Sequence, residues 1–382
     1  MLSSGERRQF YVADLGVELT QPLLRDFGNE INRARIDINK NNQHISVLEF
    51  RNTLEDQLTK LEQTYWQLVQ AQREVEIQQE LLQRTIDTAV ILALRQNQDV
   101  TRVQLAQANF AIEQRRAQLV RARARVADLS DQMKVFMNDP SVPAAGQDLV
   151  LPSTPPVLDQ IIYSPHDVVV EANRYRPEVG QQLLRVDSAL IALNVAKNNK
   201  LPRLDLTGRV SVQQVNASSM LSPVVDLFDV EQNWQGAASI QFQFEYPLGN
   251  RAALAIEKRA GLQYEQALVQ YHQLSLKVTN ETTQALREVD TTYNEIARTK
   301  QERFAAAEAL RALQVREDNN EPLTPQFVDQ KLRQQEQLAQ AQRDEAAAIS
   351  NYNIALATLE RAKGTLLRYN NVTLQEESLT KK

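Results

Sequence analysis

The chain carries the stretch Ile240-Gln-Phe-Gln-Phe-Glu-Tyr-Pro-Leu-Gly-Asn250. A stretch with the same plan lies 225 residues earlier, Leu15-Gly-Val-Glu-Leu-Thr-Gln-Pro-Leu23, and is followed by Gly28-Asn29. In both, apolar and polar residues alternate before a Pro-Leu, and a Gly-Asn then opens a long segment. Alternation of this kind predicts a β-strand with an apolar face and a polar face. Its recurrence predicts an internally duplicated chain.

Long parts of the sequence lack the residues that break helices. Positions 29–139, 262–321 and 326–363 contain neither Gly nor Pro. Such segments, rich in Ala, Gln, Leu, Glu and Arg, are typical of long helices. We predict two antiparallel helical hairpins, over about 28–137 and about 249–368, which turn at polar tips near Gln96–Gln98 and Asp318–Thr324.

The first long helix has a coiled-coil pattern. Its apolar residues recur at spacings of three and four, which is the period of a coiled-coil seam. A helix from Gly28 to Arg95 would be roughly 100 Å long at ~1.5 Å per residue, too long for one globular core to bury. The seam residues are Val47, Leu54, Leu58, Leu61, Tyr65, Leu68, Val75, Leu82, Ile86 and Ala89.

The predicted fold is therefore mainly α with a few β-strands. The first repeat, 1–138, holds a strand at about 10–21 and the first hairpin. An irregular Pro-rich connector follows at 139–176. The second repeat, 177–382, holds a short helix at 177–199, strands at about 203–213 and 236–246, the second hairpin and a C-terminal tail.

Composition excludes several classes of function. The sequence has no Cys and a net charge of -5, so neither disulfides nor affinity for nucleic acid is expected. Its three histidines lack the spacing of a metal site, and no phosphate-binding glycine loop or nucleophile motif is present. No apolar run is long enough for a membrane-spanning helix. We expect no catalytic, metal or cofactor residues and no enzyme activity.

The ordered set of segments resembles the TolC-type outer-membrane efflux proteins, the outer membrane factor family. The resemblance covers nearly the whole chain. It is carried by Ala172-Asn-Arg-Tyr-Arg-Pro-Glu178, Leu201-Pro-Arg-Leu-Asp-Leu-Thr-Gly208 and Phe242-Gln-Phe-Glu-Tyr-Pro-Leu-Gly-Asn-Arg251, with Leu19-Thr-Gln-Pro-Leu23 as the counterpart in the first half.

The resemblance implies a homotrimer whose subunits share one transmembrane β-barrel and one periplasmic tunnel of helices, an α-barrel. It implies a passive duct in the outer membrane of a Gram-negative-type bacterium, serving efflux or type I secretion. The implied partners are outer-membrane lipid, a periplasmic adaptor (membrane fusion protein) and an inner-membrane transporter. The family pattern also has a signal and a first β-strand, which residues 1–9 do not supply. We therefore expect an N-terminally truncated chain.

Alternation assigns the two faces of the barrel wall. The residues expected to face the lumen are Asp14, Glu18, Asp205, Arg209, Gln243 and Glu245. Those expected to face lipid are Leu15, Val17, Leu19, Leu206, Val210, Ile240, Phe242 and Phe244.

The family closes its tunnel with acidic residues near the second hairpin tip, and here Phe327 and Gln330 occupy two of those places. The remaining acidic candidates for a periplasmic gate are Asp99, Glu317, Asp318, Glu321 and Asp329. Exposed polarity of a turn is the alternative interpretation of these residues. For the whole chain, the alternative is a soluble coiled-coil structural or adaptor protein whose strands form a small folded module.

Overall fold

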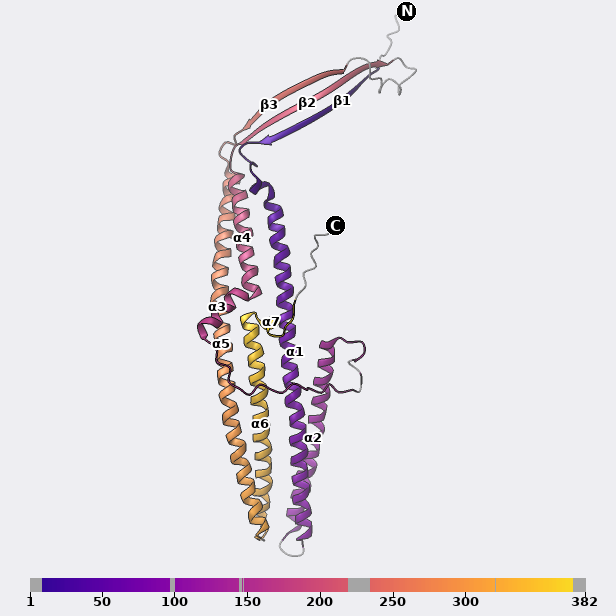
Figure 1. Ribbon diagram of the computed structural model, residues 1–382, viewed down its shortest axis with the longest axis vertical. Coiled ribbons are helices and arrows are strands. Elements are labelled where there is room, and N and C mark those ends of the chain that lie inside the picture. The colour runs from indigo at the N-terminus through magenta and orange to yellow at the C-terminus, as the bar shows by residue number, and fades with distance from the viewer. Residues whose placement is uncertain are drawn as a thin grey trace, which may run out of the picture. The chain divides into compact units, whose positions relative to one another are not determined.

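The computed structural model describes residues 9–96, 100–143, 146, 148–218, 234–319 and 321–373, with side chains described for all of these except 9–13, 214–218 and 234. The prediction of a mainly α chain with a few strands is confirmed (Figure 1). The elements are β1 (Gln9–Pro22), α1 (Asn29–Leu94), α2 (Arg102–Met137), α3 (Pro165–Tyr175), α4 (Pro177–Asn198), β2 (Arg203–Ser218), β3 (Trp234–Glu245), α5 (Arg251–Asp318), α6 (Pro325–Lys363) and α7 (Leu366–Tyr369).

The observed elements differ from the predicted ones in several of their bounds. Strand β2 reaches Ser218 and strand β3 begins at Trp234, beyond the expected 213 and 236. Helix α3 lies inside the segment 139–176 that was expected to be irregular. Pro165 is the first residue of that helix. A backbone N–H at this position would have no acceptor within the helix, so the absence of an N–H in proline costs no hydrogen bond. Proline breaks a helix in its interior, but here it begins one.

The chain forms two compact units, one of Met1–Ser46 with Gln181–His272 and one of Val47–Gly180 with Gln273–Lys382. The first unit contains an antiparallel sheet in the order β1-β2-β3. Each long helix is entered through backbone that suits glycine: Gly28 has φ 102° directly before α1, and Gly249 has φ 78° just before α5. A residue without a Cβ adopts such a φ at the least steric cost, which explains the glycine of each Gly-Asn pair.

Polar contacts join the segments that connect the sheet to the helices of the same unit. The Leu23 N–H donates to Leu204 O at 2.7 Å, and the Asn250 amide donates to Lys200 O at 2.9 Å. Lys200 also pairs with Glu257 of α5 at 2.8 Å. Polar contacts thus hold the connecting segments in place directly beside the strand ends.

The second unit contains α2 and α6 together with α1 from Val47 onward and α5 from Gln273 onward. Leu68 of α1 is fully buried in a cluster with Leu129 and Met133 of α2, as the seam predicts. In the second hairpin, residues of α5 and α6 share a cluster around Tyr352. Helix α1 also has a second apolar contact, since Ile77 and Leu81 pack with Ala339 of α6. The predicted seam omits Ile77 and Leu81 because a helix with two neighbours buries two stripes.

The connector between α2 and α3 crosses the helices as irregular chain, held by side chains (Figure 1). The Asn353 amide of α6 both donates to Val157 O, at 3.2 Å, and accepts from Val157 N, at 2.9 Å. Tyr65 Oη of α1 accepts from Thr154 N at 2.9 Å. A Pro-rich segment lacks many of the N–H groups that strand pairing needs. Side chains of the neighbouring helices therefore supply hydrogen-bond partners for its backbone groups.

Helix α6 ends at Gly364, and that glycine is in close contact with the turn between α3 and α4. Gly364 has φ 71°, and a Cβ placed on it would lie 2.8 Å from Tyr175 C, Tyr175 O and Arg176 N. Backbone atoms cannot move aside as a flexible side chain can. The position therefore demands glycine both for its φ and for its space.

We predict that Gly364→Ala destabilises the protein more than Gly249→Ala. Gly249 has a similar φ of 78°, but a Cβ placed on it would meet no atom within 4 Å, so the alanine there meets only backbone strain of about 1–2 kcal/mol. The clash at Gly364 should add a further ~1–3 kcal/mol. Chemical denaturation followed by helical circular dichroism measures both, and equal losses would contradict the close contact.

Candidate functional site

The sheet presents one apolar face and one polar face. Directly paired residues of antiparallel strands share a face. The register pairs Val17 with Val210 and Leu206 with Phe242. By this register all eight residues of the predicted apolar set lie on one face: Leu15, Val17, Leu19, Leu206, Val210, Ile240, Phe242 and Phe244.

The same register places the six residues predicted to face a lumen on the opposite face. Glu18 lies opposite Arg209, and Asp205 lies opposite Gln243. Asp14 and Glu245 belong to this face through their positions in β1 and β3. The two predicted sets are thus segregated without exception.

Within the described part of the chain, most of the apolar face is exposed. Leu19 is 75% exposed and Ile240 is 77% exposed, and Phe242 is exposed as well. A contiguous apolar patch of this kind on a folded chain marks an interaction surface.

Polar side chains on the other face pair with one another. Asp14 Oδ2 accepts from Arg209 Nη2 at 2.9 Å across β1 and β2. Arg203 Nε donates to the buried Asp205 at 2.6 Å. The polar face of the sheet therefore carries both positive and negative side chains, and not charges of one sign alone.

The acidic residues expected at the hairpin tips have different surroundings. Glu317 forms a largely buried ion pair with Lys331 of α6, with Oε2 and Nζ 2.5 Å apart. Glu321 pairs with Arg316 at 2.8 Å, and the partly exposed Asp329 pairs with Arg333.

Two further acidic candidates complete the set. Asp318 ends α5 with an exposed side chain and has no ion pair within the described part of the chain. Asp99 lies outside the described residues.

Buried polar side chains at the same end were missed from the sequence. Gln104 is fully buried and donates from Nε2 to Leu323 O at 2.6 Å. Arg115, also buried, donates to Gln335 Oε1 at 3.1 Å and to Leu332 O at 3.2 Å. Burial lowers the pKa of Arg115, and the charge of Glu336 opposes that effect. The spacing Thr101-x-x-Gln104 is a capping-box signature. It predicts the contacts between Gln104 and Thr101 but not the bond from Gln104 to Leu323.

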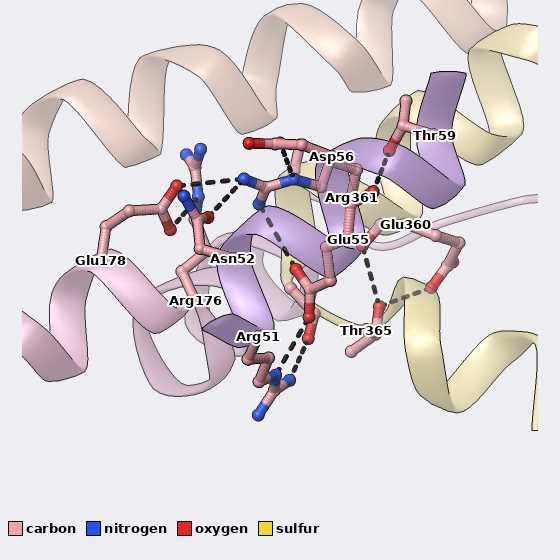
Figure 2. A network of polar contacts seen from close by, with 12 residues as sticks. Arg51, Asn52, Glu55, Asp56, Thr59, Arg176, Glu178, Glu360, Arg361 and Thr365 are labelled. Atoms are coloured by element: carbon pink, nitrogen blue, oxygen red, sulfur yellow. Dashed lines mark hydrogen bonds and ion pairs between the residues drawn. The ribbon is translucent and has the colours of Figure 1, made fainter. Parts of the chain in front are cut away.

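A network of charged side chains surrounds the end of α6 (Figure 2). Arg361 donates to Asp56 Oδ1 at 2.8 Å, to Asn52 Oδ1 at 2.5 Å and to Glu178 Oε1 at 3.2 Å. A longer bond of 3.4 Å joins Arg361 Nη1 to Glu55 Oε2. One guanidinium thus joins α1, α4 and α6.

Glu55 is the fully buried member of this network. It accepts from Arg51 Nε at 3.0 Å as well as from Arg361. Burial nevertheless raises the pKa of Glu55, although both arginines oppose the shift. For Arg361 the balance is opposite: burial alone would lower its pKa, but the bond to Asp56 and the surrounding carboxylates raise it. Arg361 keeps partial access to solvent, whereas Glu55 has none.

The described residues offer no constellation for metal chemistry. Within that part of the chain, no three His, Asp or Glu side chains gather closely enough to hold a metal ion. Among the described helices, none combines the length and the hydropathy needed to span a bilayer.

The sequence matches no protein-family model and no curated protein. Solved structures do match it. A membrane protein from Pseudomonas aeruginosa has a TM-score of 0.70 at 17% identity, over 94% of this chain and 85% of that chain. The outer membrane protein VceC of Vibrio cholerae has a TM-score of 0.68 at 16% identity, over 94% and 87%. The MtrE outer membrane channel of Neisseria gonorrhoeae has a TM-score of 0.70 at 14% identity, over 94% and 81%.

The chain has the fold of the TolC-type outer-membrane channels. Of these neighbours, MtrE is an outer membrane channel. The resemblance seen in the sequence is therefore confirmed at the level of fold. In this chain, the segregated sheet and the hairpin ends are the two candidate functional regions.

The buried pair at the hairpin end should be far more sensitive to substitution than the more exposed pair beside it. Lys331→Met leaves Glu317 buried without its cation, which should cost about 3–5 kcal/mol of unfolding free energy. Arg333→Met should change stability little, because its pair with Asp329 is open to solvent and screened.

Chemical denaturation of the two variants checks this contrast. The double variant Glu317→Gln with Lys331→Met should recover part of the loss, since no charge is then left unpaired. Equal stabilities for Lys331→Met and Arg333→Met would show that the pair of Glu317 and Lys331 is solvated.

The pKa of Glu55 predicts a pH dependence of stability. Since burial raises this pKa above its ordinary 4.5, the folded state holds the proton more tightly than the unfolded state. Stability due to Glu55 is therefore present below pH 4.5 and is lost as pH rises through the folded-state pKa. Relative to Glu55→Gln, the natural protein should become less stable as pH rises from about 4.5. A stability advantage of the natural protein that grows with pH would mean that the arginines outweigh burial.

Proposed function

We propose that this chain is one protomer of a trimeric outer-membrane channel, a passive exit duct of a tripartite efflux or type I secretion system. The observation that carries the proposal is the uncovered apolar face of the sheet, backed by a polar face, in a chain with the TolC-type fold. Three copies would close their strands into one transmembrane β-barrel, with the apolar face toward lipid and the polar face toward the lumen.

The edges of the sheet support closure with other copies. Among the described strands, β1 and β3 each pair with β2 alone. An open edge in lipid would leave backbone N–H and C=O groups without partners, so a membrane sheet must close. Three strands are too few to close on themselves. Neighbouring subunits are the natural source of the missing pairing.

The helical hairpins would extend into the periplasm of a Gram-negative-type bacterium. There, helices from three copies would surround a tunnel that docks a periplasmic adaptor and an inner-membrane transporter. The duct itself would perform no chemistry and would take its energy from that transporter. The repeat of strand, Pro-Leu, Gly-Asn and long helix supports an origin by internal duplication, with repeats at 1–138 and 177–382 joined by 139–176.

The hairpin ends would form the periplasmic gate. Glu317, Glu321 and Asp329 each have a basic partner within the chain, which reduces the field they present to a passing solute. Asp318 has no ion pair among the described residues, so its charge would be available, and three copies would bring three such carboxylates near the axis. A ring of this kind attracts cations.

A soluble coiled-coil adaptor is the competing function. A soluble module would bury its apolar strand residues in a core of its own. The exposure of Ile240, Phe242 and Phe244 supports the duct instead.

Two adjacent residues of β3 test the proposal. Phe244→Arg places a charge on the face assigned to lipid and should cost roughly 2–4 kcal/mol of barrel stability. Gln243→Arg places the same charge on the face assigned to water, so it should cost little and shift the ion selectivity. The measurements are trimer stability in detergent and conductance in planar bilayers.

Because the two positions are neighbours, each variant controls for the general effect of arginine in this strand. Equal losses of stability for Phe244→Arg and Gln243→Arg would contradict the assignment of one face to lipid and the other to water. Trimers that carry no current with either residue at 243, even when Asp318 is neutralised, would refute the duct.

A further inference from the structure

A cavity of about 430 Å³ lies among α1, α5, α6 and the connector, with all of its lining residues in the second compact unit. Its volume falls in the range of small-molecule sites, which measure roughly 300–1,000 Å³. Part of its wall is apolar and is formed by Val69 of α1, Pro156 of the connector and Ile349 of α6. The cavity can therefore take an apolar group of a small molecule.

Hydrogen bonds fix the wall of the cavity. The connector is held on both sides of Pro156, because side chains of α1 and α6 bond to the backbone of Thr154 and Val157. The buried Ser350, which also lines the cavity, donates from Oγ to Trp66 O of α1 at 3.1 Å. A ligand entering this space would therefore not have to order the chain around it, which is a cost that weakens binding at mobile sites.

The polar part of the wall has an excess of positive charge. Its charged lining residues in the described chain are Arg73 of α1, Arg303 of α5 and Glu345 of α6. Arg73 pairs with Glu76 at 2.5 Å, but both side chains are mostly exposed, and such a pair contributes little. A cationic ligand would be repelled by this excess charge, whereas an anionic one would be attracted.

Arg303 is held in place with donors to spare. Its buried Nε lies 2.5 Å from Glu345 Oε2, in an ion pair that lacks the alignment of a hydrogen bond. Its guanidinium carbon lies 4.5 Å from the centre of the Phe304 ring, a contact that restricts the guanidinium. Among the described residues, neither Nη1 nor Nη2 has a hydrogen-bond partner. Two such nitrogens match the oxygens of a carboxylate or a similar oxyanion.

We propose that this cavity binds a small amphipathic anion. The apolar body of the ligand packs against Val69, Pro156 and Ile349, and its one oxyanion group accepts from Nη1 and Nη2 of Arg303. Arg73 adds a second positive charge, which is open to solvent. An uncharged molecule of the same shape leaves the nitrogens of Arg303 without partners and binds more weakly. The site lies within one chain and does not depend on the proposed duct.

Two fluorescent probes test the site in the full-length protein in detergent. One is ANS, an anilinonaphthalene sulfonate, and the other is N-phenylnaphthylamine, which has the same rings without the sulfonate. Trp66 lies one turn before Val69, and Trp234→Phe removes the other tryptophan of the sequence, so energy transfer from Trp66 detects a probe in the cavity. ANS should give saturable transfer and should bind more tightly than the neutral probe. Transfer from ANS that does not saturate would overturn the proposal.

Substitutions separate the charge of the site from its shape. Arg303→Gln should weaken ANS binding about tenfold to a hundredfold, the effect of losing hydrogen bonds to a charged group, and should leave the neutral probe unaffected. Arg298→Gln, at an exposed arginine of the same helix outside the cavity lining, is the matched control and should change neither.

A second variant keeps every charge and fills the space. Ala346→Phe places a ring in the cavity and should abolish the saturable binding of both probes, while probe dissolved in micelles still gives its linear background. This variant decides the question if circular dichroism shows that Arg303→Gln alters the helices. Saturable ANS binding that survives Ala346→Phe would overturn the proposal, as would equal ANS affinities for Arg303→Gln and Arg298→Gln.

Discussion

The structure depends on one constraint: an amphipathic helix of 66 residues cannot bury its apolar residues without neighbours along its whole length. Helix α1 meets this need with α2 on one side and α6 on another, through Leu68 and through Ile77. The hairpins, the crossing connector and the charged network around Arg361 all serve to hold helices beside one another. Lateral packing takes the place of a globular core.

The features that sequence predicted are those that local chemistry decides. Alternation over 240–245 defined a strand, and a register shift of one residue would have moved every side chain to the other face. Long segments without Gly or Pro defined the hairpins, since few other residues end a helix. The whole apolar set, from Leu15 to Phe244, lies on one face because strand periodicity is short and strict. That these faces meet lipid and lumen is a separate proposal.

The features that sequence did not predict depend on residues far apart in the chain. The pair of Glu317 and Lys331 joins two helices, and nothing in either segment distinguishes it from an exposed pair. Gln104 was visible as half of a capping box, but its bond to Leu323 crosses 219 residues. Helix α3 was missed because proline carries opposite meanings at the start and in the interior of a helix.

The crossing connector has a consequence for the order in which the chain folds. Contacts within each hairpin are close in sequence, so hairpins can form early. The backbone of the connector instead bonds to Tyr65 of α1 and Asn353 of α6, on opposite sides of it in the sequence. The two bonds cannot exist together until helices from both hairpins stand beside each other. The connector is therefore among the last segments to acquire its native hydrogen bonds, and its ordering reports that the two hairpins have met.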